Sequence, residues 1–215
     1  MSIADLRRVD RDGAIEEAAE RVGHTRGAFF GRAAVAAGGL MGGGAVLGAL
    51  PSVAAAQSQT DVDILNFALT LEELETAFYA DALAKAGLKG DAAAAAQEIG
   101  AHEAAHVAAL RKALGGKAIA KPTFDFGGAT ANEAAFLKTA VTLEDTGVAA
   151  YKGQAPLIQD AKILAAALSI HSVEAKHAAW VRRLVKGNPA PAAFEGPKTM
   201  AQVLAAVKAT GFLKG

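Results

Sequence analysis

The chain has 215 residues, of which 52% are hydrophobic, and equal numbers of acidic and basic side chains leave it without net charge. This length suits one domain with appendages, and the balanced charge argues against binding to nucleic acid through a basic surface. Cysteine is absent, which excludes thiolate metal ligands, disulfide bonds and a lipidated cysteine anchor.

Residues 1–56 have the layout of an export signal. Six arginines lie within residues 1–32, an uncharged stretch rich in Gly and Ala follows at 33–50, and small residues at 54–56 form a cleavage motif before Gln57. The uncharged stretch is long enough to cross a membrane. Its scarcity of large apolar residues favours cleavage over a retained anchor, so we expect an exported protein without stable membrane insertion; a retained signal would leave the protein anchored.

The segment 25–32 is similar to the twin-arginine export signal, in which two arginines precede apolar residues. It departs from that pattern at Gly27, where the second arginine is expected. The export route therefore stays open.

Residues 57–190 carry the pattern of four long helices, and residues 191–215 form a C-terminal extension. In the first helix Ile64, Phe67 and Leu71 repeat with the spacing of an apolar helical face. Capping residues, including Asp91, and glycines define the expected ends: 60–86, 91–114, 130 or 132 to 153, and 157–186. A short fifth helix at 199–210 would cover one end of the bundle with Met200, Val203, Leu204 and Val207.

The connections between these helices predict the topology. The first two helices, and likewise the last two, are joined by a few residues, so each pair should form an antiparallel hairpin. The segment 115–130 has no helical period and could extend to roughly 50 Å, enough to run back along a whole helix. The expected fold is therefore all-α: a four-helix bundle of two hairpins joined by a long crossover, plus a short C-terminal helix.

The two hairpins repeat each other in sequence. Residues 68–79 align without gaps on residues 140–151 with six of the twelve positions identical, including Glu72 with Glu144 and Tyr79 with Tyr151. In the second helix of each hairpin, the Glu-x-x-His motif at 103–106 aligns on the one at 174–177. The chain therefore reads as a duplicated helical hairpin.

Each copy supplies one glutamate and one Glu-x-x-His motif, whose two side chains project from neighbouring positions on one helical face. This order matches the ligand set of carboxylate bundles that hold two iron or two manganese ions. Four carboxylates would balance the charge of two divalent cations, whereas without cations they would be costly in an apolar interior. The predicted metal ligands are Glu72, Glu103, His106, Glu144, Glu174 and His177.

Several nearby residues have two interpretations. Glu75 could reach the face of Glu72, but its equivalent in the second copy is Gly147, so the repeat favours Glu72 as the ligand. Tyr79 and Tyr151 each follow a ligand glutamate by seven residues, and could act in electron transfer or as core rings hydrogen-bonded to a carboxylate.

The remaining polar residues near the motifs are expected at the margin of the site. Glu73 and Asp145 should face solvent or contact a ligand, and His102 and His171 should lie behind the ligands or at the rim of the site. Trp180 is expected in the core.

Residues 60–187 resemble the ferritin-like superfamily, in particular exported bacterial ferritin-like proteins related to plant desiccation-associated proteins. Segments 65–69 and 143–147 carry that resemblance beside the repeated motifs. The resemblance implies that Glu103 and Glu174 bridge two metal ions, that Glu72 and Glu144 each bind one, and that tyrosines such as Tyr79 lie near the metals.

The resemblance leaves two classes of function open. One is an oxidoreductase that binds two divalent ions, iron first and manganese as the alternative, and that handles O₂ or peroxide in stress protection. The other is a stress-protective structural or binding bundle in which metal is absent or only stabilises the fold. The oligomeric state is open, a homo-oligomer included, and mineral storage is disfavoured because nothing in the sequence indicates the contacts of a cage.

Overall fold

The computed structural model describes residues 59–214. The predicted export signal at 1–56 and its cleavage before Gln57 lie outside the described residues. Within the described part of the chain, no helix is both long and apolar enough to cross a membrane.

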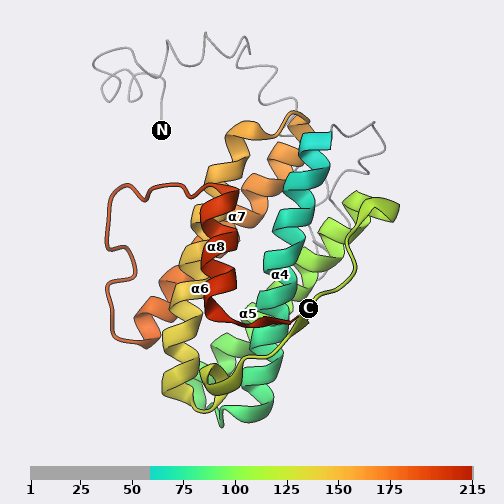
Figure 1. The fold of residues 1–215 in the computed structure, drawn as a ribbon. Coiled ribbons are helices and arrows are strands. Elements are labelled where there is room, and N and C mark those ends of the chain that lie inside the picture. The colour runs from blue at the N-terminus through green and yellow to red at the C-terminus, as the bar shows by residue number, and fades with distance from the viewer. Residues whose placement is uncertain (1–58, 215) are drawn as a thin grey trace, which may run out of the picture. The chain divides into compact units, whose positions relative to one another are not determined.

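Residues 59–214 form a bundle of four long helices with a fifth, shorter helix beside it (Figure 1). The helix α4 packs along α5, and α6 packs along α7, so the chain forms the two predicted hairpins. The predicted all-α bundle with a short C-terminal helix is confirmed. The helices are α4 (Gln59–Lys85), α5 (Gly90–Leu114), α6 (Glu133–Gln154), α7 (Ala161–Leu184) and α8 (Met200–Thr210).

Side-chain caps define the starts of the helices in the second half of the bundle. The Asn132 side chain accepts a hydrogen bond from the backbone N–H of Ala135 at the start of α6. Thr199 and Gln202 form a reciprocal capping box at the start of α8. Because such caps satisfy backbone donors that would otherwise lack partners, the beginnings of these helices are encoded locally.

Two predicted helix starts were wrong. The cap of α5 is Lys89, so Asp91 lies within the first turn, where its charge favours the helix dipole without capping it. The helix α7 begins at Ala161 instead of residue 157, because Ala155–Leu157 form a separate 3₁₀ turn, η4, and Asp160 then caps α7. An apolar pattern that continues through a turn hides such a break.

The crossover between α5 and α6 contains structure that the sequence did not reveal. It carries two 3₁₀ turns, η2 (Gly115–Lys117) and η3 (Gly127–Thr130), and a short strand, β1 (Thr123–Phe124). This strand pairs antiparallel with β2 (Leu213–Lys214) at the C-terminal end of the described residues. The pairing joins segments far apart in sequence, so no local pattern predicts it.

Within the apolar core the ring of Phe78 stacks on that of Phe136 at a centroid distance of 5.4 Å. The helix α8 packs beside α6 and adds Val203 and Val207 to this core, whereas Leu204 is 43% exposed and does not contribute as expected. Trp180 is 38% exposed, so its prediction as a core residue was wrong.

Candidate metal centre

All six predicted ligand side chains meet in the interior of the bundle. Each long helix contributes to this cluster, because the glutamates of α4 and α6 face the Glu-x-x-His motifs of α5 and α7. The four carboxylates are completely buried, His177 is 2% exposed, and the side chain of His106 is 12% exposed. The residues are Glu72 on α4, Glu103 and His106 on α5, Glu144 on α6, and Glu174 and His177 on α7.

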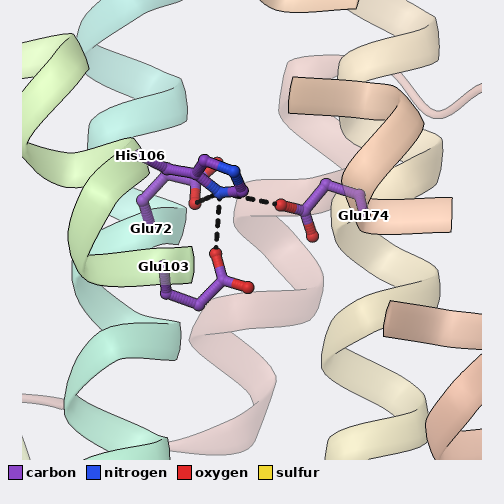
Figure 2. A group of neighbouring side chains, drawn as sticks. All are labelled: Glu72, Glu103, His106 and Glu174. Carbon is purple, nitrogen blue, oxygen red and sulfur yellow. Dashed lines mark hydrogen bonds and ion pairs between the residues drawn. The ribbon is translucent and has the colours of Figure 1, made fainter. Parts of the chain in front are cut away.

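One half of the cluster surrounds His106. Its Nδ1 lies 3.1 Å from Oε2 of Glu72, 3.1 Å from Oε2 of Glu103 and 3.1 Å from Oε1 of Glu174. Figure 2 shows these carboxylates converging on the imidazole. The four side chains offer ligand atoms within 4.8 Å of one another, close enough to surround one metal ion.

The other half surrounds His177. Its Nδ1 lies 2.8 Å from Oε1 of Glu103, 3.5 Å from Oε2 of Glu144 and 3.8 Å from Oε2 of Glu174. These four side chains form a second group of possible ligands. Glu103 and Glu174 belong to both groups, whereas Glu72 and Glu144 belong to one each. Two shared and two unshared carboxylates are the arrangement that a bridged pair of ions requires.

Despite these short distances, several buried polar atoms of the cluster lack a well-formed hydrogen bond in the described part of the chain, because one imidazole N–H cannot serve all the oxygens around it. They are Oε1 of Glu103, Oε2 of Glu144, both carboxylate oxygens of Glu174 and Nδ1 of His177. Unpaired buried oxygens are costly, and carboxylates without cations more so. Carboxylate oxygen and imidazole nitrogen are suitable ligands for iron and manganese. The donor set therefore fits divalent cations.

Without a metal, protons on the two histidines supply the positive charge. Although burial disfavours a charged imidazole, hydrogen bonds to the surrounding carboxylates raise the pKa of His106 to about 12 and that of His177 to about 11. Burial likewise opposes ionisation of Glu103, but hydrogen bonds with both histidines lower its pKa to about 2. The raised histidine pKa values and the lowered Glu103 pKa show that positive charge is stabilised at this position, as the unpaired carboxylate oxygens also indicate.

The two outer glutamates respond differently from Glu103. Burial, followed by the charges of Glu174 and Glu103, raises the pKa of Glu72. Burial also raises the pKa of Glu144, to about 8, and the charges of Glu174 and Glu103 add to this while hydrogen bonding with His177 opposes it. The cluster thus has too few positive charges to keep all its carboxylates ionised.

Each tyrosine of the repeat binds a glutamate of the opposite hairpin. The Tyr151 hydroxyl donates to Oε1 of Glu72 at 2.5 Å, and the Tyr79 hydroxyl donates to Oε1 of Glu144. Both rings are buried. The arrangement matches the interpretation as core rings hydrogen-bonded to carboxylates, and it fixes the orientation of both outer glutamates.

Glu75 lies in the interior although the repeat did not assign it to the ligands. Its side chain is 3% exposed, and burial together with the charge of Glu174 raises its pKa. A Cβ atom on Gly147 would lie 3.5 Å from Oε1 of Glu75 and 3.3 Å from Oε2 of Glu174. Gly147 therefore leaves space beside both carboxylates. In the sequence, the only indication of this contact is that Gly147 occupies the position equivalent to Glu75 in the repeat.

The acidic residues next to the outer glutamates form ion pairs with Arg111 and Arg182, which occupy equivalent positions in the two hairpins. Glu73 is 2% exposed and accepts from Nε of Arg111 at 2.8 Å, so it does not face solvent. The equivalent Asp145 lies 2.7 Å from Nη2 of Arg182 and keeps 37% of its side chain exposed. Both pairs join the two helices of one hairpin.

The two histidines outside the repeat differ in position. Nδ1 of His102 lies 2.9 Å from Nε2 of His177, the ring nitrogen that faces away from the carboxylates, and its Nε2 lies 3.3 Å from the exposed Glu98. His102 is thus behind a predicted ligand, as expected. His171 belongs to neither ligand group.

The fold and this cluster define a four-helix-bundle protein with a carboxylate–histidine site suited to metal in its interior. A family model described as a ferritin-like domain matches residues 60–187, and the chain belongs to this family. A search of curated protein sequences finds no match.

Proposed function

We propose that the protein holds two divalent metal ions in the bundle core and uses them in an oxidoreductase reaction with O₂ or peroxide. One ion would be held by Glu72, Glu103, His106 and Glu174, and the other by Glu103, Glu144, Glu174 and His177. The observation that carries the proposal is the sharing of Glu103 and Glu174 by both ligand groups. Iron is the expected metal, with manganese as the alternative.

The protein's own residues would prepare this site in two ways. Complete burial of the four carboxylates excludes bulk water, so a bound ion is held by protein ligands and not displaced by solvent. The hydroxyls of Tyr79 and Tyr151 hold Glu144 and Glu72 in fixed orientations. When bound, the reduced metal pair would supply the electrons for reduction of O₂ or peroxide, and an external electron donor, or a second peroxide molecule, would return it to the reduced state.

We expect this chemistry to act outside the cytoplasm, in protection against desiccation or oxidative stress. The arginine-rich segment, the uncharged stretch at 33–50 and the small residues before Gln57 support export. N-terminal sequencing of protein from the culture medium or cell envelope should begin at or near Gln57. Recovery of only the full-length chain from membranes would contradict cleavage and favour a retained anchor.

The test of the metal proposal is elemental analysis of the protein purified from its native host, followed by measurement of peroxide and O₂ consumption. We expect two iron or manganese ions per chain and turnover that disappears after chelation. The matched variants are Glu174→Gln, within the cluster, and Glu98→Gln, an exposed glutamate on α5. The first should lose metal and turnover, and the second should keep both.

The same experiment separates the two functional classes. Bound metal that raises the melting temperature without consuming peroxide or O₂ would identify a structural bundle stabilised by its ions. Absence of metal after reconstitution with Fe²⁺ and Mn²⁺ would reject the metal centre, while the fold assignment would stand.

A further inference from the structure

An apolar cavity of about 260 Å³ lies among the four long helices, next to the carboxylate cluster. Its walls include Ile64 and Leu71 from α4, Leu110 from α5, and Ile163 and Ile170 from α7. Ile64 and Leu71 are seven residues apart, which corresponds to about 10 Å along a helix. Apolar walls favour an apolar occupant, since engineered cavities of ~150 Å³ with similar walls bind small apolar molecules.

The cavity wall includes one buried polar side chain. Gln154 is 5% exposed and lines the cavity. Its amide offers both a hydrogen-bond donor and an acceptor to a bound molecule.

The charged residues of the lining have a single sign. Lys112 and Lys162 are exposed and line the cavity, so they mark its solvent side, and no acidic side chain is part of the lining. Lys112 lies near the end of α5, Lys162 near the start of α7 and Gln154 at the end of α6. Because neighbouring helices are antiparallel, these three residues meet at one end of the bundle, where an anionic group would find charge and hydrogen-bond partners.

The inner end of the cavity reaches the carboxylate cluster. The ring of Tyr151 is part of the cavity wall, while its hydroxyl donates to Oε1 of Glu72. Leu71, beside Glu72 in the sequence, also lines the cavity. An occupant would thus contact a residue that is hydrogen-bonded to a proposed metal ligand.

We infer that this cavity binds a small amphiphilic carboxylate, with its acyl chain directed toward Leu71 and Tyr151 and its carboxylate beside Gln154, Lys112 and Lys162. The walls consist of protein side chains alone, so binding does not require the metal ions of the proposed function. In that function the site would place an organic molecule beside the metal centre.

The test is isothermal titration calorimetry of the full chain with octanoate, whose unbranched chain suits a narrow site between helices. We expect saturable binding of one octanoate per chain, with similar affinity in the metal-free and the metal-loaded protein. Octylamine, which has the opposite charge, should bind at least about tenfold more weakly, a difference of about 1.4 kcal/mol. Equal binding of octanoate and octylamine would overturn the assignment of an anionic ligand.

The matched variants are Ala166→Phe and Ala165→Phe. Ala166 lines the cavity, whereas its neighbour Ala165 is exposed and does not. Ala166→Phe should weaken octanoate binding at least about tenfold and Ala165→Phe by less than about twofold. Melting curves of both variants would show that they fold, and Lys162→Gln provides a second test by weakening octanoate but not 1-octanol.

Three results would overturn the inference. One is octanoate binding that Ala166→Phe leaves unchanged, and another is absence of saturable binding to the full chain. The third is binding that occurs only after removal of the residues before Gln57, which would identify that segment of the chain as the occupant. Loss of metal with octanoate binding intact would instead reject the proposed function alone.

Discussion

The two hairpins, α4–α5 and α6–α7, provide the same ligands but differ at a buried position beside them. Each gives an outer glutamate, a Glu-x-x-His motif, and a tyrosine that donates to the outer glutamate of the other hairpin. At this position the first hairpin has the buried carboxylate of Glu75, where the second has Gly147. The duplicated sequence therefore builds a symmetric set of ligands, but the extra carboxylate of Glu75 makes the charge around these ligands different on the two sides.

The residues that contact the ligands from behind, and the ion pairs beside them, also differ between the two hairpins. His102 lies against His177, and its equivalent in the second hairpin is Val173, so only one of the two ligand histidines has an imidazole partner. The repeated ion pairs also differ in burial, since Glu73 is almost inaccessible and Asp145 is partly exposed. Experiments that change equivalent positions in both hairpins can measure how far the symmetry extends.

The largest effect is expected from the two shared glutamates. Glu103→Ala and Glu174→Ala should each abolish binding of both ions, because each removes a ligand from both groups. In the metal-free protein Glu103→Ala should lower the melting temperature, because Glu103 pairs with both protonated histidines. With Fe²⁺ or Mn²⁺ the melting temperature of the wild type should rise while that of either variant stays unchanged, because binding to the native state adds RT ln(1 + [L]/Kd).

Metal content after reconstitution and melting curves with and without Fe²⁺ or Mn²⁺ check this prediction, with Glu98→Ala as the exposed control. Retention of one ion in either variant would contradict the shared role. Unequal losses between Glu103→Ala and Glu174→Ala would show that the two hairpins are not equivalent ligands.

The metal-free protein should lose stability as the pH rises from about 5 to 8. The pKa of Glu72 is raised in the folded state and that of Glu144 is raised from 4.5 to about 8, so the folded chain binds more protons than the unfolded chain in this window. The folded state also raises the pKa of His106 to about 12 and that of His177 to about 11. The two protonated histidines therefore contribute their full stabilisation of the folded state below about pH 6.5, and this contribution is lost as the pH rises toward these values.

Glu103 acts in the opposite direction but at lower pH. Its pKa of about 2 contributes stability above 4.5 that is lost as the pH falls through about 2. Thermal melting of the metal-free protein across this range should show a fall of more than about 5 °C between pH 5 and 8. Metal affinity should rise over the same window, because the ligands must lose protons. A metal-free protein that becomes more stable at pH 8 would contradict the pKa shifts.

The repeated ion pairs should differ in their contribution to stability. Arg111→Met leaves the buried Glu73 without its principal cation and should cost about 3 kcal/mol. Arg182→Met leaves the partly exposed Asp145 to solvent and should cost about 1 kcal/mol or less. Urea unfolding of both variants in metal-free form measures the difference, and equal losses would show that burial of Glu73 does not matter.

The smallest effect concerns the asymmetric pair itself. In the Glu75→Ala background, Gly147→Ala should stabilise the protein by about 1 kcal/mol, because alanine favours the helix more than glycine does. With Glu75 present, crowding of its carboxylate and that of Glu174 should cancel this gain. A double-mutant cycle should give a coupling of about 1 kcal/mol.

Metal analysis complements that cycle. Because Glu75 belongs to neither ligand group, Glu75→Ala should leave the number of bound ions unchanged. Additive effects of the two substitutions would show that Glu75 and Gly147 are independent. Loss of one ion in Glu75→Ala would make Glu75 a ligand and the asymmetry part of the metal centre.

The sequence by itself determined the bundle and the members of the cluster. Helical periodicity indicated the four long helices, and the start of the third was narrowed to residue 130 or 132, because capping depends on residues within one turn. The duplication then identified Glu72 and Glu144 among several acidic candidates, since a ligand position is repeated in both copies. Periodicity, capping and duplication can all be recognised in the sequence alone, because they depend on neighbouring residues or on a regular spacing.

Only the tertiary structure decided which side chains face one another across helices. The crossed bonds from Tyr79 and Tyr151, the burial of Glu73 against Arg111 and the pairing of β1 with β2 all join segments far apart in the chain. The exposure of Trp180 and the position of Glu75 beside Gly147 depend on how adjacent helices are rotated. Helix rotation is set by packing over the whole interior, so no short stretch of sequence specifies it.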